Sequence, residues 1–328
     1  MGTLIVKSIK RVEAPKTKVF DVSVEDNHNF FIKPKGSDVN ILVHNCHKIP
    51  ADGYANTLSK FNAMHMFGLT GTPDRKDGKY PVTDRLIGPV TYQVKVKTMT
   101  PRVHLHKTGI AKKTYQMWTR AMQHLANHEE RNEMIVKQAI KDMKAGHSVI
   151  IPVTFQKHAD HLVEMINKRW KGKEEQIALS FTGRIPKHKR KDVLDSLRDG
   201  TFRCTVAMRS MLTGVNVPLW SAIYTVIPIS NVPNYTQEIT RVMTPMEGKC
   251  EPIIRVYVDE TWGLALGCFA TCWKSLKKYK LHKKSKDTLA EFFDGLRNKG
   301  SRSGDADDQY KPHKSDHGKK KPTKRLKF

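Results

Sequence analysis

The chain has 328 residues, enough for about two globular domains. Lys and Arg number 58 against 32 Asp and Glu, so the formal net charge is +26, which favours a polyanionic partner such as nucleic acid. No apolar run approaches the ~20 residues of a membrane span, and five scattered cysteines make no disulfide framework. The composition therefore argues against a membrane or secreted protein, and we expect a cytoplasmic one.

The first 45 residues differ from the rest of the chain. They hold short β-type runs (LIVKSI, KVFDVSV, NFFI and NILV) separated by turn formers, with no amphipathic helix. This pattern predicts a short all-β segment.

From about residue 101 the pattern alternates between strand and helix. The strand candidates are 148–153, 177–180, 203–208, 222–227 and 253–258. Between them lie an amphipathic helix with apolar residues at 159, 162, 163 and 166, and a Lys/Arg-rich helix from about 186 that stops near Gly200. Such alternation predicts an α/β domain with a parallel sheet, whose functional loops lie at the carboxyl ends of the strands.

The last part of the chain is basic. After about residue 273 it reads as helical, and from about 299 it becomes polar and charged, ending HGKKKPTKRLKF. We expect this basic tail to be disordered because it has too little apolar surface to order itself.

A first group of spaced residues precedes a cysteine. Asp21 and His28 lie in VFDVSVEDNHNFFI, and a terminal apolar strand ends in His44-Asn45, followed by Cys46. His-Asn-Cys alone reads as a loop after a strand. With the upstream spacing, residues 1–45 resemble the carboxyl-terminal motif block of inteins, the protein-splicing elements.

The resemblance implies a chemistry for these residues. The Asn45 side-chain amide would attack its own carbonyl carbon, forming a succinimide and cutting the chain. His44 and His28 would transfer protons, Asp21 would orient the site, and Cys46 would be the acyl acceptor. No amino-terminal intein part precedes Met1. We therefore expect a split intein that acts in trans with a separate chain, an incomplete gene product being the alternative.

A second group follows the cysteine. Cys46-His47 is followed 20 residues later by FGLTGTPDRKDG, from Phe67 to Gly78. This segment resembles the third motif of the superfamily 2 helicases, and Cys46-His47 resembles the back half of their Asp-Glu-Cys-His Walker B box. The Asp-Glu half would come from the partner chain. A metal-binding pair is the alternative for Cys46-His47, with no other Cys/His cluster nearby.

The helicase resemblance extends over roughly 46–275. It includes motif IV (149–166), the segment Ser180–Gly183, motif V (213–218) and motif VI (237–245). It implies RecA-like α/β lobes, divided as follows: intein fragment 1–45, end of lobe one 46–100, lobe two 101–262, carboxyl-terminal helices 263–298 and disordered tail 299–328.

The same resemblance implies the nucleotide contacts. These are Gly214, Asn216, Gln237 and Arg241, with Arg241 as the arginine finger or, alternatively, a structural helix arginine. Thr240 and Thr244 replace the usual Gly and second Arg of motif VI. The chain has no G-x-x-x-x-G-K-[ST] sequence, so we expect no ATP hydrolysis by this chain alone. ATP and Mg²⁺ would be held mainly by the partner chain, which carries Walker A.

Nucleic acid would contact both lobes, mainly through its phosphates. The candidate contacts are Thr70, Thr182, Gly183, Arg184, Arg209, Ser210 and Thr213. Trp220 and Tyr235 could stack on bases, but we expect both in the core. DNA is the expected substrate, with RNA as the alternative.

Together these patterns predict a splicing precursor. With its partner it would yield an ATP-dependent superfamily 2 DNA helicase or translocase of phage type. One alternative is a non-catalytic nucleic-acid-binding protein with an inactive intein remnant. Another is the motor subunit of a restriction system.

Overall fold

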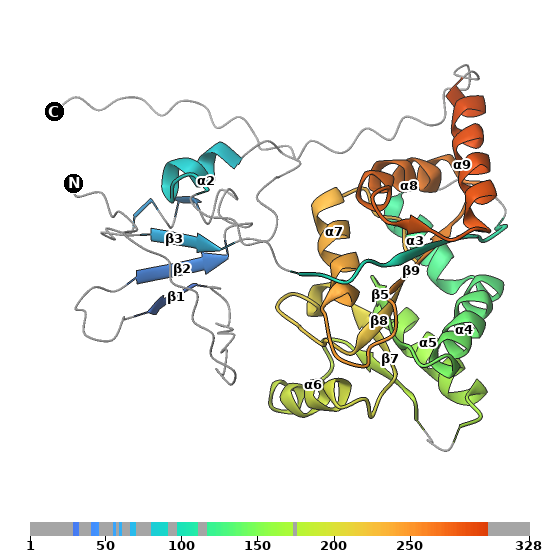
Figure 1. Cartoon of the computed structure of the whole chain (residues 1–328), viewed down its shortest axis with the longest axis horizontal. Helices are drawn as coiled ribbons and strands as arrows, with labels where there is room; N and C mark the ends of the chain where they lie inside the picture. The colour runs from blue at the N-terminus through green and yellow to red at the C-terminus, as the bar shows by residue number, and fades with distance from the viewer. Residues whose placement is uncertain are drawn as a thin grey trace.

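The computed structural model describes residues 29–32, 41–45, 55–56, 59–60, 66–69, 80–90, 97–110, 117–172 and 176–300. Residues 29–32, 41–45 and 66–69 form a three-stranded sheet (Figure 1). Strand β1 (Asn29–Ile32) is antiparallel to β2 (Ile41–Asn45), and β2 is parallel to β3 (Met66–Leu69). Helix α2 (Tyr80–Leu86) follows. The predicted NFFI and NILV strands are thus present, whereas the two earlier runs lie outside the described residues.

A seven-stranded sheet forms the core of the larger part, in the order β10-β4-β9-β8-β5-β7-β6. Its members are β4 (Arg102–Lys107), β5 (Ser148–Val153), β6 (Ala178–Phe181), β7 (Cys204–Met208), β8 (Trp220–Thr225), β9 (Ile253–Val258) and β10 (Lys280–Leu281). Every neighbouring pair is parallel, as the strand–helix alternation predicts. Strands β5 and β9 coincide with their predicted ranges, and the other three are shifted by one or two residues.

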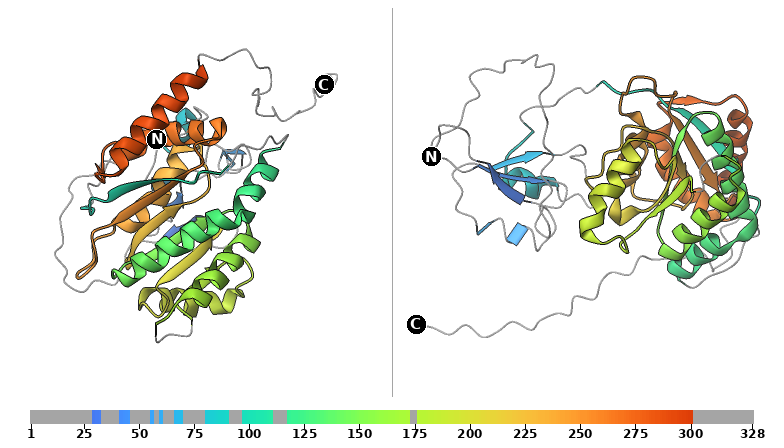
Figure 2. Two further views of the ribbon diagram at one scale, coloured as in Figure 1. Left: turned by 90° about the vertical axis from the view of Figure 1, so that its right-hand side faces the viewer. Right: turned by 90° about the horizontal axis from the view of Figure 1, so that it is seen from below.

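Helices cover both faces of this sheet (Figure 2). They are α3 (Trp118–Asn127), α4 (Glu129–Lys144), α5 (Gln156–Arg169), α6 (Arg190–Arg198), α7 (Val232–Thr240), α8 (Gly263–Leu276) and α9 (Ser285–Gly300). The basic helix α6 starts later than predicted because residues 187–189 form a 3-10 turn first. It ends just before Gly200, whose φ of +87° favours glycine.

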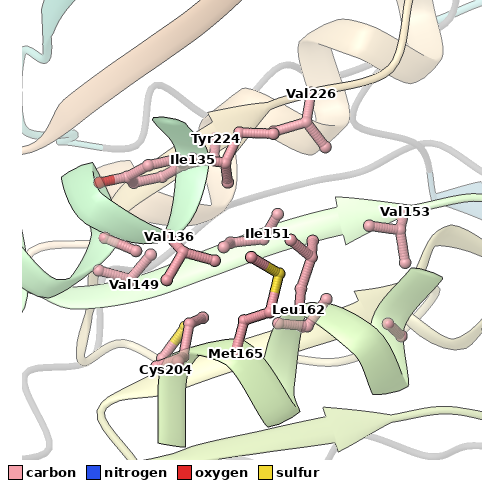
Figure 3. Packing of buried hydrophobic residues seen from close by; sticks show 14 of the residues in the cluster. Ile135, Val136, Val149, Ile151, Val153, Leu162, Met165, Cys204, Tyr224 and Val226 are labelled. Atoms are coloured by element: carbon pink, nitrogen blue, oxygen red, sulfur yellow. The ribbon is translucent and has the colours of Figure 1, made fainter. Parts of the chain in front are cut away.

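Alternate residues of the central strand β5 enter two separate cores. Val149, Ile151 and Val153 pack with α3, α4 and α5, and Figure 3 shows this cluster around Leu162. Ile150 faces the opposite side, where α6 to α9 pack. Helices α8 and α9 lie beyond residue 262, the predicted end of the second lobe, but they pack against the sheet of that lobe.

Buried polar networks tie α4 to the sheet. Arg255 donates to Asp142 from Nε (2.5 Å) and Nη2 (2.6 Å), and the Tyr224 hydroxyl donates to the same carboxylate at 2.5 Å. These hydrogen bonds hold the pKa of Asp142 below its usual value although burial acts in the opposite direction. Arg131, fully buried, donates from Nε to Asp259 at 3.0 Å.

Two aromatic residues proposed as possible base-stacking groups are core residues. Trp220 is 1% exposed and Tyr235 is 3% exposed, which confirms the expectation that they pack internally. None of the helices in the described part of the chain is long and apolar enough to cross a bilayer.

Candidate nucleic-acid and nucleotide site

The carboxyl ends of three adjacent strands bring polar residues together. Thr154 follows β5, Thr182 follows β6 and Arg209 follows β7, and these strands are neighbours in the sheet. Gln156 Nε2 donates to Thr182 Oγ1 at 3.2 Å, and Arg209 Nη1 donates to Thr154 Oγ1 at 3.5 Å. At the strand ends where the sequence predicts a functional edge, the structure thus has two separate polar pairs.

Arg209 acts as a brace at these strand ends. Its Nε donates to Glu238 Oε2 at 2.9 Å, and its Nη2 donates to the Ile227 carbonyl oxygen at 3.2 Å. The side chains of Arg209 and Glu238 are 25% and 8% exposed. The sequence interpretation treated Arg209 as a phosphate contact. In the structure its charge is already paired, and it joins the ends of β5 and β8 to α7.

The other predicted nucleic-acid contacts divide into two kinds. Thr182 is buried, so its side chain serves the fold and only its backbone could reach a phosphate. Gly183, Arg184, Ser210 and Thr213 are exposed. Arg184 is paired at 3.0 Å with Asp160, but its side chain remains 69% exposed. Arg184 is thus the most accessible cation of the predicted set.

The motif V segment, residues 213–218, is held by cations from three different elements. Arg241 Nη1 donates to the Val215 carbonyl at 2.6 Å, and Arg198 Nε donates to that of Asn216 at 3.2 Å. Lys249 Nζ donates to the Pro218 carbonyl at 2.7 Å. A backbone segment with no strand or helix of its own is therefore fixed from α6, from the end of α7 and from the chain before β9.

Arg241, the predicted arginine finger, is half-buried beside this segment. Burial lowers the pKa of its guanidinium, while Glu238 acts in the opposite direction. Gly214 has a φ of +74°, and it and Asn216 are exposed, while Gln237 is half-buried. These guanidinium, amide and backbone groups suit a nucleotide's phosphates and sugar. Over the described residues there is no cluster of three or more His, Cys, Asp or Glu that could hold a metal.

Several predicted site residues cannot be placed. Asp21, His28, Cys46, His47 and Thr70 lie outside the described residues.

His44 and Asn45 are described in backbone only, at the end of β2. In the β1–β2 ladder Asn29 pairs with His44, and in the β2–β3 ladder Asn45 pairs with Leu69. The predicted His-Asn terminus therefore ends a strand that pairs on both sides.

Sequence reasoning missed the residues that support the site. Glu238, Gln156, Arg198 and Lys249 were given no role. Glu238 carried one usable signal, because it lies three residues before Arg241, the residue that directly follows α7. The others act across long sequence separations that no local pattern reveals.

Comparison with known proteins finds that part of this chain is similar to helicases. Residues 130–244 match the family described as helicase conserved C-terminal domain. Over 217 residues the chain is 26% identical to the DNA 3'-5' translocase XPB2 of Sulfurisphaera tokodaii, covering 54% of this chain and 49% of that protein. It is 24% identical over 218 residues to the probable helicase D10 of Escherichia phage T5, covering 65% and 47%. The chain thus spans about half the length of these relatives.

Solved structures share the fold. A fragment of a putative HsdR subunit of a type I restriction enzyme from Vibrio vulnificus has a TM-score of 0.52 at 20% identity, covering 66% of this chain and 43% of that one. Dbp5 of S. cerevisiae, bound to RNA and ADP BeF3, has a TM-score of 0.50 at 11% identity, covering 78% and 63%. Residues 130–244 are thus similar to a helicase C-terminal domain, and the parallel sheet that contains them has the fold of these solved structures.

Proposed function

We propose that this chain carries a superfamily 2 helicase C-terminal domain and supplies the second motor lobe of an ATP-dependent DNA helicase or translocase. The observation that carries the proposal is the polar carboxyl edge of β5, β6 and β7 within the matched region. The relatives named as a DNA translocase and a phage helicase favour DNA over RNA.

Each part of the edge has a separate task. The backbone of Gly183 and the side chains of Arg184, Ser210 and Thr213 bind phosphates, while Arg209 keeps the strand ends in place. Phosphate contacts give little sequence specificity and strong salt dependence.

Direct binding tests the nucleic-acid half of the proposal. Fluorescence anisotropy should show salt-dependent binding of the full chain to single- and double-stranded DNA, with weaker binding to RNA of the same sequence. Equal affinities for RNA and DNA would contradict the assignment of DNA as the substrate. Absence of binding at low salt would contradict the proposal.

The test of ATP hydrolysis requires a second chain that supplies the first lobe. When bound, ATP with Mg²⁺ supplies the phosphoanhydride that is hydrolysed, and this chain contributes Arg241 to stabilise charge on the γ-phosphoryl group. With a chain that carries Walker A and the Asp-Glu pair, Arg241→Lys should lower DNA-stimulated ATPase about 10³-fold, the lower range for an arginine finger. The control is Arg169→Lys, a cation exposed on α5 and paired with Glu133.

Two alternatives predict other outcomes of the same assay. A non-catalytic nucleic-acid-binding protein would bind DNA but show no ATPase with any first lobe. The motor subunit of a restriction system would hydrolyse ATP only on DNA with its recognition sequence. The HsdR likeness does not favour this second reading, because at 20% identity it concerns the fold alone.

We also propose that residues 1–45 are an intein carboxyl-terminal segment that splices at Asn45-Cys46, in trans if its other half is a separate chain. One structural observation favours this function. The antiparallel pairing of Asn29 with His44 brings the residue that follows His28 beside the His-Asn terminus, although Asn29 and His44 are 15 residues apart in the sequence. The chemistry needs these parts of the chain close together.

Intact mass tests the splicing proposal. After mixing with a chain that carries the missing intein half, a species should appear that has lost residues 1–45 and gained residues ending in Asp-Glu. Asn45→Ala, which removes the cyclising amide, should abolish that product. Identical spectra for both variants with an active intein half would exclude splicing.

A further inference from the structure

A cavity lies at the opposite edge of the sheet from the strand ends that carry Thr154, Thr182 and Arg209. It has a volume of ≈ 250 Å³ and is lined by residues at the amino ends of β5, β7, β8 and β9, among them Ser148, Arg203, Ser221 and Lys249. A six-residue strand such as β5 is about 20 Å long, so this cavity and the carboxyl edge are separate sites.

The cavity presents an unused donor. Ser148 is 5% exposed, and its hydroxyl has no hydrogen-bond partner among the described residues. Its own backbone N–H donates to Ser221 Oγ at 3.1 Å, and Ser221 Oγ also lies 3.1 Å from His147 Nδ1. The Ser221 hydroxyl is therefore engaged, whereas the buried hydroxyl of Ser148, a residue of the cavity lining, has its hydrogen-bonding capacity unused among the described residues.

Two cations line the same space. Lys249 Nζ uses two of its three protons on the carbonyls of Pro218 (2.7 Å) and Thr244 (2.9 Å), leaving one. Burial lowers the pKa of Lys249 to about 8, so an anionic neighbour would stabilise its charged form. Arg203 adds a guanidinium, and Asp199 is the one acidic side chain of the lining.

We propose that this amino-edge cavity is a binding site for a phosphate group, held by the Arg203 guanidinium, the Lys249 ammonium and the Ser148 hydroxyl. Donors outnumber acceptors in the lining, and a tetrahedral oxyanion offers acceptors in several directions. The volume exceeds the ~30 Å³ share of one liquid water, so the space admits a larger group.

The site has a structural link to the motor residues. Lys249 joins the cavity to Pro218, the last residue of the motif V segment, and to Thr244, just after the 3-10 turn that contains Arg241. An anion held by Lys249 would therefore order the chain at the ends of both motifs. The site itself does not depend on splicing or on ATP hydrolysis.

Calorimetric titration of the full chain at constant ionic strength tests the proposal, with inorganic phosphate in one arm and AMP in the other. We expect saturable binding in at least one arm. Binding of inorganic phosphate would identify the free ion as sufficient, and binding of AMP alone would identify a phosphomonoester. No saturable binding in either arm would overturn the proposal.

Variants separate this site from general attraction to a basic protein. Arg203→Gln should weaken binding about 10-fold, and Ser148→Ala should weaken it by a smaller factor. Arg169→Gln removes an equal charge from a residue that is outside the lining and paired with Glu133, and it should leave binding unchanged. Asp199→Asn should tighten binding about 2-fold, because it removes the acidic charge and keeps an acceptor for Thr201. Equal weakening by Arg203→Gln and Arg169→Gln would overturn the proposal.

Discussion

Arg209 is paired with the buried Glu238, whereas Arg184 is largely exposed. We therefore predict that Arg209 contributes mainly to stability and Arg184 mainly to DNA binding. Arg209→Gln would leave the Glu238 carboxylate, which is 8% exposed, without its cation. Losing one member of a buried pair costs about 3–5 kcal/mol of the free energy of unfolding, and the 25% exposure of Arg209 reduces this to about 2–3 kcal/mol. Arg184, whose side chain is 69% exposed beside Asp160, should lose no more than about 1 kcal/mol on the same change.

DNA affinity should show the reverse order. Arg184→Gln should lower the slope of log affinity against log salt by about 0.9 on duplex DNA, the value for one lost phosphate contact. Arg209→Gln should leave that slope unchanged. Urea denaturation and salt-dependent anisotropy measure the two quantities on the same samples. If Arg209→Gln were as stable as the unchanged protein and had a reduced slope of log affinity against log salt, the structural role of Arg209 would be refuted. Arg209 would then be a phosphate contact.

Two further predictions concern stability. Burial lowers the pKa of His158 to about 3, and Asn132 Oδ1 lies 3.0 Å from its Nε2. Because the unfolded state takes up a proton near pH 6.5 and the native state does not, the free energy of unfolding should fall from pH 6.5 downward, by about 2 kcal/mol at pH 5 for this group. Urea titrations should show a shallower fall for His158→Gln. Gly200→Ala should cost about 1–2 kcal/mol in thermal unfolding, since φ is +87° and a Cβ would lie 3.2 Å from Leu219 Cδ2; an unchanged midpoint would contradict this.

The sequence was informative where a pattern is local. The fully buried strand Ser148–Val153 is apolar from residue 149 to 153, and such a run predicts a buried strand. The expectation of functional loops at the carboxyl edge followed from the strand–helix alternation, because parallel strands end at the same side.

The sequence was uninformative about side-chain partners. Arg209 and Arg184 look alike as basic residues after a strand, yet one is paired with Glu238, 29 residues later, and the other is exposed. The difference arises from the packing of α7 against the strand ends, which brings Glu238 to Arg209. The amino-edge cavity was missed for a related reason, since Ser148, Arg203 and Lys249 are brought together from three different strand starts.

The strand order also affects which fragment of this protein is suitable for expression. The family match ends at residue 244, before β9, and begins at 130, after β4. A fragment with those limits would keep β5 to β8 but lose the partner of β8 along Ala222–Thr225. Its buried backbone donors and acceptors would then form an open edge, which is a template for pairing between copies. The family match is therefore smaller than the sheet, and expression limits set by that match alone should give an aggregating product.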